Sequence, residues 1–212
     1  MSPLLPRLLS HTPAIVKRQA LVQLFRATAA AFQVDMPRLS GLSREQCLLG
    51  YAHFTANQAD EVLRQGGDLF ELQERLYRNA YRLGRTAGWL PGSHSVNRVM
   101  TLGRALYDIL DIDFSGSASG SVSGSNGGSD SGSDSGTDSG EITISRCYFS
   151  SYYSPEVCRV MSAMDRGLLA GLAGGGELMF SQRITEGHPC CRARFTPAGS
   201  PSSARPWQEQ TT

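Results

Sequence analysis

Three cysteines and one aspartate near the C-terminal end of the chain are the residues best suited to chemistry: Cys147, Cys158, Asp165 and Cys191. A thiol can act as a nucleophile, and a carboxylate can transfer protons as a general acid or base. We expect these four side chains to converge between a helix and a sheet and to form a small-molecule site. His188 lies in the turn before Cys191, so its imidazole is expected at the rim of that site.

The helix expected over residues 154–172 would position two of these side chains. Ser154 is a suitable N-cap, and Pro155 suits the first turn. At about 100° per residue, Cys158 and Asp165 lie within about 20° of each other around the helix axis. Both flank an apolar stripe and therefore border the buried face. A carboxylate in that position is costly unless it is paired or hydrogen-bonded.

Strand alternation places the other two thiols. Residues 141–147 alternate and are rich in β-branched side chains, which predicts a strand that ends at Cys147. In the strand expected over 190–195, the arginines share one face with Cys190 and should face water. Cys191 lies on the other face and therefore points inward, whereas Cys190 is excluded from the site.

Each of these residues also has a plainer interpretation. A buried free cysteine usually acts as a small apolar core residue, and Asp165 could pair locally with a neighbouring arginine. The joint occurrence of the four residues in one short segment is what favours a site. A metal centre of three cysteines, with or without Asp165, has suitable ligand types but lacks a Cys-x-x-Cys element. We therefore predict no metal and no other cofactor.

The sequence before this segment has the pattern of α-helices. Ser43-Arg-Glu-Gln46 has the form of a capping box. Residues 68–87 carry apolar side chains at steps of three and four, the pattern of an amphipathic helix, and a further helix is expected over 95–110. Amphipathic helices with short connections predict a helical layer that packs on another element.

Composition divides the chain into parts. Residues 115–140 are almost entirely Ser, Gly and Asp and predict a disordered insertion. We expect a flexible N-terminus over 1–11 and a disordered tail over 197–212. The helical part, 12–114, and the α/β part, 141–196, would then form one domain. The predicted fold class is α+β: a helical layer packed with a small, mainly antiparallel sheet and one covering helix.

The composition of the 212 residues limits the class of partner. Hydrophobic residues make up 40% of the chain, which suffices for one core, and the net charge is +1. A charge near zero gives no electrostatic reason to expect nucleic acid or an anionic membrane. No segment approaches the roughly 20 apolar residues that span a bilayer. We expect a small-molecule substrate, no nucleic acid and no membrane; a homo-oligomer is left open.

The cysteine count bears on the compartment. Five cysteines in a chain without a secretion signal favour reduced thiols over a disulfide framework, and thus a cytoplasmic protein. The first residues are rich in apolar and basic side chains, but prolines interrupt them before a signal-peptide core could form. An organelle-targeting peptide is the alternative interpretation of this segment.

The stretch ISRCYFSSYYSPEVCRVMSAMDRGLLAGL…FSQRITEGHPCCRARF resembles the L-2-amino-thiazoline-4-carboxylic acid hydrolase family. The residues that match in order and approximate spacing are Cys147, Cys158, Asp165, Gly187 and Cys191. The segment YRNAYRLGRTAG also looks like that family, so the resemblance spans about residues 40–196, and the insertion falls between the two matching parts. His188 stands where the family usually has Asp, and Ala193 stands where it usually has an aromatic residue.

The resemblance implies hydrolytic opening of a cyclic amidine, such as 2-amino-thiazoline-4-carboxylate, to an N-carbamoyl amino acid. Such a reaction needs a nucleophile at the ring carbon and a proton donor for the departing atom. We expect Cys191 or Cys158 to be the nucleophile or to orient a water molecule. Asp165 would be the general base, and His188 would act as an acid or base at the rim.

The same reaction needs a cation for the substrate carboxylate, and Arg85 or Arg183 is expected to supply it. Two alternatives come from other classes of protein. The chain could be a tailoring enzyme of secondary metabolism that acts on a related heterocycle or thioether. It could also be a non-catalytic small-molecule-binding domain, similar to the sensor domains related to vinyl reductase.

Overall fold

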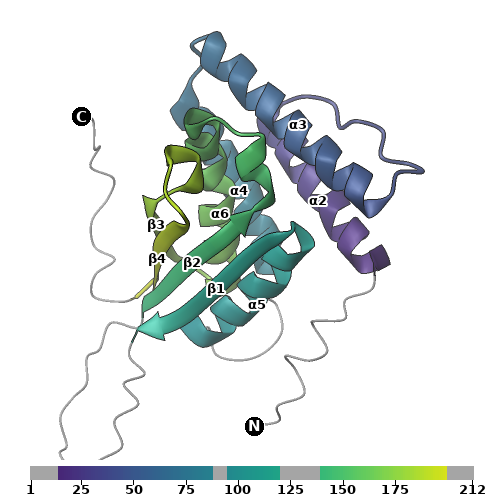
Figure 1. The fold of residues 1–212 in the computed structure, drawn as a ribbon. Helices are drawn as coiled ribbons and strands as arrows, with labels where there is room; N and C mark the ends of the chain where they lie inside the picture. Colours follow the sequence, from purple (N-terminus) through teal and green to yellow (C-terminus); the bar gives the residue numbers. More distant parts are fainter. Residues whose placement is uncertain (1–13, 88–94, 120–138, 200–212) are drawn as a thin grey trace, which may run out of the picture.

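The computed structural model describes residues 14–87, 95–119 and 139–199, in which helices pack against one antiparallel sheet (Figure 1). The helices are α2 (Ala14–Phe32), α3 (Arg44–Arg64), α4 (Leu69–Ala87), α5 (Val96–Ile109) and α6 (Pro155–Ala173). The strands are β1 (Ile112–Ser119), β2 (Ser139–Cys147), β3 (Gly176–Gln182) and β4 (Cys191–Pro197). Two short 3₁₀ turns are η1 (Tyr148–Ser151) and η2 (Ile184–Glu186). The predicted α+β fold class is confirmed.

The sheet has the order β1-β2-β4-β3, and all neighbouring strands are antiparallel. Its inner face is apolar, with Ile142, Ile144 and Phe195 buried. Its outer face is polar, and Glu141 forms an ion pair with Arg194 there at 2.8 Å. This alternation is expected of a sheet that has one face packed and one face in water.

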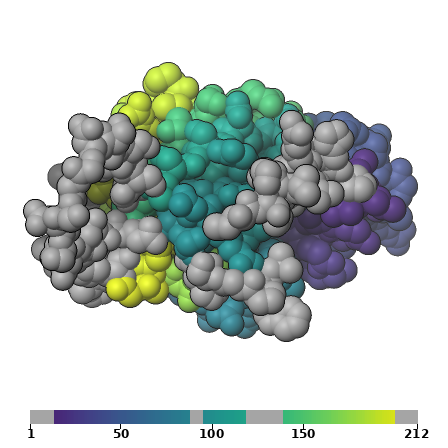
Figure 2. All heavy atoms as spheres, turned by 90° about the horizontal axis from the view of Figure 1, so that it is seen from below, coloured from purple at the N-terminus to yellow at the C-terminus, as the bar shows by residue number. Residues whose placement is uncertain are grey.

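The helices form a layer over the inner face, where α5 packs on β1 and α6 packs on β3. Figure 2 shows α2 and α3 toward one end of the molecule and the yellow C-terminal residues toward the other, with α5 and β1 between them. Ser43 and Gln46 form the predicted capping box at the start of α3. The site described below lies where this helical layer meets the sheet.

Strand β1 was not expected, and it corrects the boundaries predicted for the insertion at 115–140. Residues 115–119 belong to β1, and 139–140 begin β2. Serine and glycine serve as strand residues here because α5 closes over them. A Cβ atom on Gly116 or Gly140 would come within 2.5 or 2.4 Å of the Met100 side chain. The rest of the predicted insertion, 120–138, lies outside the described residues, as do 1–13 and 200–212.

Glycine allows α6 to lie almost backbone to backbone on α4. A Cβ on Gly167 would lie 2.2 Å from the Tyr77 carbonyl oxygen, and one on Gly171 would lie 2.3 Å from the Tyr81 carbonyl oxygen. Only a residue without a side chain permits so close an approach. The contact fixes the position of α6, and with it the side chains that α6 directs toward the sheet.

Candidate functional site

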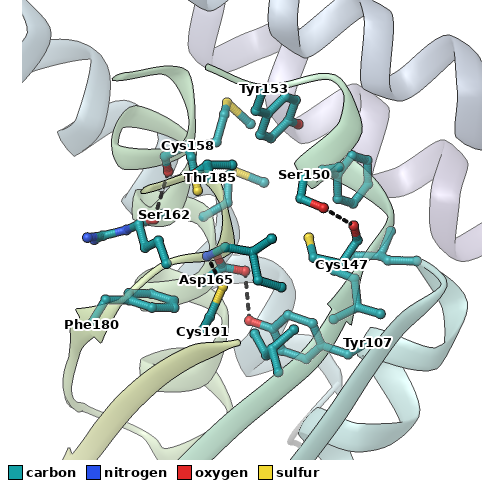
Figure 3. A pocket seen from close by; sticks show the side chains of 18 of the residues that line it. Tyr107, Cys147, Ser150, Tyr153, Cys158, Ser162, Asp165, Phe180, Thr185 and Cys191 are labelled. Carbon is teal, nitrogen blue, oxygen red and sulfur yellow. Dashed lines mark hydrogen bonds between the residues drawn. The ribbon is translucent and has the colours of Figure 1, made fainter. Parts of the chain in front are cut away.

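A pocket of about 90 Å³ lies between α6, the end of β2 and the start of β4 (Figure 3). Cys147, Cys158, Asp165 and Cys191 all line it. The structure thus brings together the four side chains that were expected to converge between a helix and the sheet. Arg183 also lines the pocket, and most of the remaining wall is apolar.

The N-terminal part of α6 positions two of these residues. The Ser154 hydroxyl accepts a hydrogen bond from the Val157 backbone N–H at 3.2 Å, and Pro155 occupies the first turn. Cys158 follows in the first turns, and Asp165 lies about two turns further along the same side. The helix therefore presents both side chains to the pocket, as Figure 3 shows.

Asp165 is the acidic group of the pocket. Burial raises the pKa of its carboxyl to about 6, although a hydrogen bond from Tyr107 and the charges of Arg183 and Arg166 act in the opposite direction. The Tyr107 hydroxyl donates to Asp165 Oδ1 at 2.7 Å. A carboxyl with a pKa of about 6 exchanges its proton close to neutral pH, which suits a general acid or base.

Tyr107 also lines the pocket, and the sequence did not predict it there. Its side chain is buried, and its ring stacks on that of Phe114 with centroids 4.9 Å apart. Burial and the neighbouring Asp165 raise the pKa of the phenol well above its ordinary value, so the hydroxyl stays protonated and donates. The available signal was its spacing, because Tyr107 continues the buried face of α5 that includes Met100 and Gly103.

The three thiols of the pocket are unpaired, and each is held in its protonated form. Burial raises the pKa of Cys147 to about 12 and also raises the pKa values of Cys158 and Cys191. The Ile184 backbone N–H donates to Cys191 Sγ at 3.4 Å. Activated cysteines occupy electropositive surroundings that lower the pKa, so these surroundings do not favour a thiolate nucleophile.

Arg183 brings a positive charge to the pocket from the end of β3. Its side chain is 18% exposed and lies over the Phe180 ring, with Cζ 4.9 Å from the centroid. One guanidinium nitrogen, Nη1, is 3.6 Å from Glu186 Oε1. Its Nε is buried and has no hydrogen-bond partner within the described chain. Because Arg183 lines the pocket, its positive charge can attract an anionic ligand group there.

His188 and Arg85, the other two predicted site residues, do not line the pocket. His188 is exposed in the loop after η2, where Gly187 adopts a left-handed conformation with φ of 90° and turns the chain. Arg85 is exposed in the last turn of α4. Its neighbour Gly84 faces α6, and a step of about 100° carries Arg85 away from that contact.

No group of three or more His, Cys, Asp or Glu side chains among the described residues is arranged to hold a metal ion. None of the described helices is both long and apolar enough to cross a membrane.

Comparisons with protein-family models, curated proteins and solved structures give no significant match. The resemblance to the thiazoline-carboxylate hydrolases therefore stays a prediction.

Proposed function

We propose that the protein is a small-molecule hydrolase that opens a cyclic amidine or thiazoline carboxylic acid of the 2-amino-thiazoline-4-carboxylate type. The observation that carries this proposal is Asp165, a carboxyl with a pKa of about 6 in a mainly apolar pocket. Such a group can remove a proton from water and return it to a leaving atom at neutral pH. Arg183 supplies the cation for the substrate carboxylate.

The reaction uses these groups as follows. The Asp165 carboxylate removes a proton from water while the water oxygen bonds to the amidine carbon, and the C=N electron pair moves to the ring nitrogen, which takes that proton from the Asp165 carboxyl. The carbon–sulfur bond then breaks as the carbonyl forms, and the departing sulfur takes the remaining proton. One water molecule is consumed, and the product is an N-carbamoyl amino acid that carries a thiol.

Cys158 and Cys191 would orient the water molecule or the ring rather than attack it. Their raised pKa values keep both thiols protonated, which makes them weak nucleophiles and weak hydrogen-bond donors. Two roles were expected for these thiols, as nucleophile or as the group that orients water, and this assignment keeps only the second. Cys147, with a pKa of about 12, would form part of the wall.

The pocket volume supports a compact substrate. Its volume of about 90 Å³ is smaller than the ~150 Å³ apolar cavity that holds benzene in another protein. A five-membered ring suits this space, provided that its carboxylate lies at the partly exposed Arg183. The five unpaired cysteines support a reducing compartment, and we place the activity in the cytoplasm.

An assay with 2-amino-thiazoline-4-carboxylate, which detects the released thiol and the product mass, tests the proposal. We expect the Asp165→Asn variant to lose about 10²-fold or more in turnover, because an amide cannot accept the proton. The matched control is Asp113→Asn, which makes the same change at an exposed carboxylate on β1 and should leave turnover unchanged. Equal turnover in both variants would refute the role of Asp165.

A second candidate function is binding without turnover, as in a sensor domain. The protonated state of the three pocket thiols favours it, because the pocket then contains no activated nucleophile. The same assay separates the two functions. Saturable binding of the thiazoline with no product by mass spectrometry would replace the hydrolase with a binding domain.

A further inference from the structure

A second cavity lies among α2, α4 and α5, and we call it the apolar chamber. It has a volume of about 250 Å³, larger than the ~150 Å³ cavity that holds benzene. Its walls include Leu21, Leu83, Leu106 and Ile109. Gln23, Thr86 and Ala87 in its wall are exposed, so the chamber is open to solvent on one side and is not an internal void.

The chamber offers almost nothing for a polar ligand to bind. Gln23 and Thr86 are the polar residues among those that line it. The Gln23 side-chain oxygen accepts a hydrogen bond from Arg26 Nη1 at 3.1 Å, and the Thr86 hydroxyl donates to the Arg82 carbonyl oxygen at 2.9 Å. Since both groups already have partners, the chamber suits a hydrocarbon group and disfavours a charged one.

The chamber and the Asp165 pocket share part of their walls. Leu24, Leu110 and Leu168 line both cavities. Leu168 lies on α6 only three residues after Asp165, so the acidic group and this shared wall are about one helical turn apart. A ligand whose polar head lies at Asp165 can therefore direct a hydrocarbon group along these leucines toward the chamber.

We propose that the apolar chamber binds the hydrocarbon substituent of an amphipathic carboxylic acid whose polar head occupies the Asp165 pocket, with its carboxylate at Arg183. The substrate class is thus narrowed to acids that carry an alkyl or aryl group in addition to the reacting head. This inference rests on the ligand-binding part of the proposed function and does not require the hydrolytic step.

Titration calorimetry of the full chain with straight-chain alkanoates from acetate to dodecanoate tests the inference. We expect affinity to rise about fourfold with each added methylene, the increment for burial of a CH₂ group, until the chamber is full. The Thr86→Phe variant fills the chamber from an exposed helical position and should abolish the increment while short acids bind as before. If this variant does not fold, Ala87→Phe, at the next lining position, replaces it.

The matched control is Thr101→Phe on α5. Thr101 is also exposed, and its hydroxyl also donates to the carbonyl oxygen four residues earlier, at 2.9 Å, but it lines neither cavity. This variant should keep the full increment. An affinity that does not change with chain length would refute binding in the apolar chamber. The same increment in Thr86→Phe as in the unchanged protein would refute it too. Absence of binding for every acid would overturn the chamber and the ligand site together, whereas a normal increment without thiazoline turnover would refute only the hydrolase.

Discussion

At neutral pH the ionised form of Asp165 is disfavoured by its surroundings, because burial outweighs the Tyr107 hydrogen bond and the nearby arginines. Its pKa rises from 3.8 to about 6 on folding. Between these two values the folded state keeps a proton that the unfolded state has released, so stability falls as pH rises through this window and then stays constant. Folding thus disfavours the ionised carboxylate, and such a group in a pocket favours a functional reason for its presence.

The Asp165→Asn variant should therefore be more stable than the unchanged protein, even though it is expected to be inactive. Asparagine can still accept the Tyr107 hydrogen bond but has no charge to desolvate. We expect a gain of roughly 3 kcal/mol at pH 7.5, from about two pKa units at 1.36 kcal/mol each, which shrinks to about 1 kcal/mol at pH 4.5. Urea unfolding at the two pH values measures it, and a loss of stability at pH 7.5 would contradict the pKa shift.

The residues of the site differ in how far the sequence alone predicts them. The spacing of residues along a helix is enough to predict the direction of Cys158 and Asp165, and the alternation along a strand is enough for Cys191. Both patterns depend only on residues that are close in the sequence. Tyr107 depends on how α5 packs across α6, which no local pattern contains. His188 does not line the pocket, and its direction depends on the left-handed turn at Gly187, which the sequence pattern does not predict.

At the scale of the elements, the crossing of α4 and α6 holds the site in place. The glycines at this crossing have no room for a methyl group, whereas Gly50 in α3 has only the Phe25 ring near it, at 4.0 Å. The helices themselves were predictable from their apolar spacing. Their close approach was not, because the glycine positions gain meaning only when the two helices are paired.

Gly167→Ala should lower the free energy of unfolding by about 1–3 kcal/mol, since overpacking against the Tyr77 backbone outweighs the better helix propensity of alanine. Gly50→Ala is the matched control and should raise stability by about 0.5–1 kcal/mol, because the new Cβ meets no obstacle. Chemical denaturation of both variants gives the comparison. Stabilisation by both changes would show that α6 is not held at backbone distance from α4.

At the scale of the whole molecule, the site lies at one end of the β1–β2 hairpin and the Ser/Gly-rich segment joins the strands at the other. Ile112 pairs with Cys147 at the pocket end, and Ser119 pairs with Ser139 at the far end. Eight residues of strand separate these ends by roughly 25 Å, at about 3.3 Å per residue. The Ser/Gly-rich composition of residues 115–140 concealed the strand residues 115–119 and 139–140.

Replacement of residues 120–138 by Asn-Gly should leave the fold and ligand binding unchanged. The paired ends of β1 and β2 are already adjacent, and a two-residue turn of this sequence closes an antiparallel hairpin. Thermal unfolding and titration with the thiazoline carboxylate check this expectation. A large fall in affinity with an unchanged melting temperature would assign the segment a part in the site.

The pH dependence of 2-amino-thiazoline-4-carboxylate turnover tests the central claim, that Asp165 is the acid–base group of a substrate pocket. We expect kcat/KM to rise with pH through a midpoint of about 6, the pKa of Asp165 in the free protein. Tyr107→Phe removes the hydrogen bond that lowers this pKa and should move the midpoint upward, whereas Tyr81→Phe, outside the pocket, should not. A midpoint that stays in place in the Tyr107 variant, or the absence of turnover at every pH, would contradict the account.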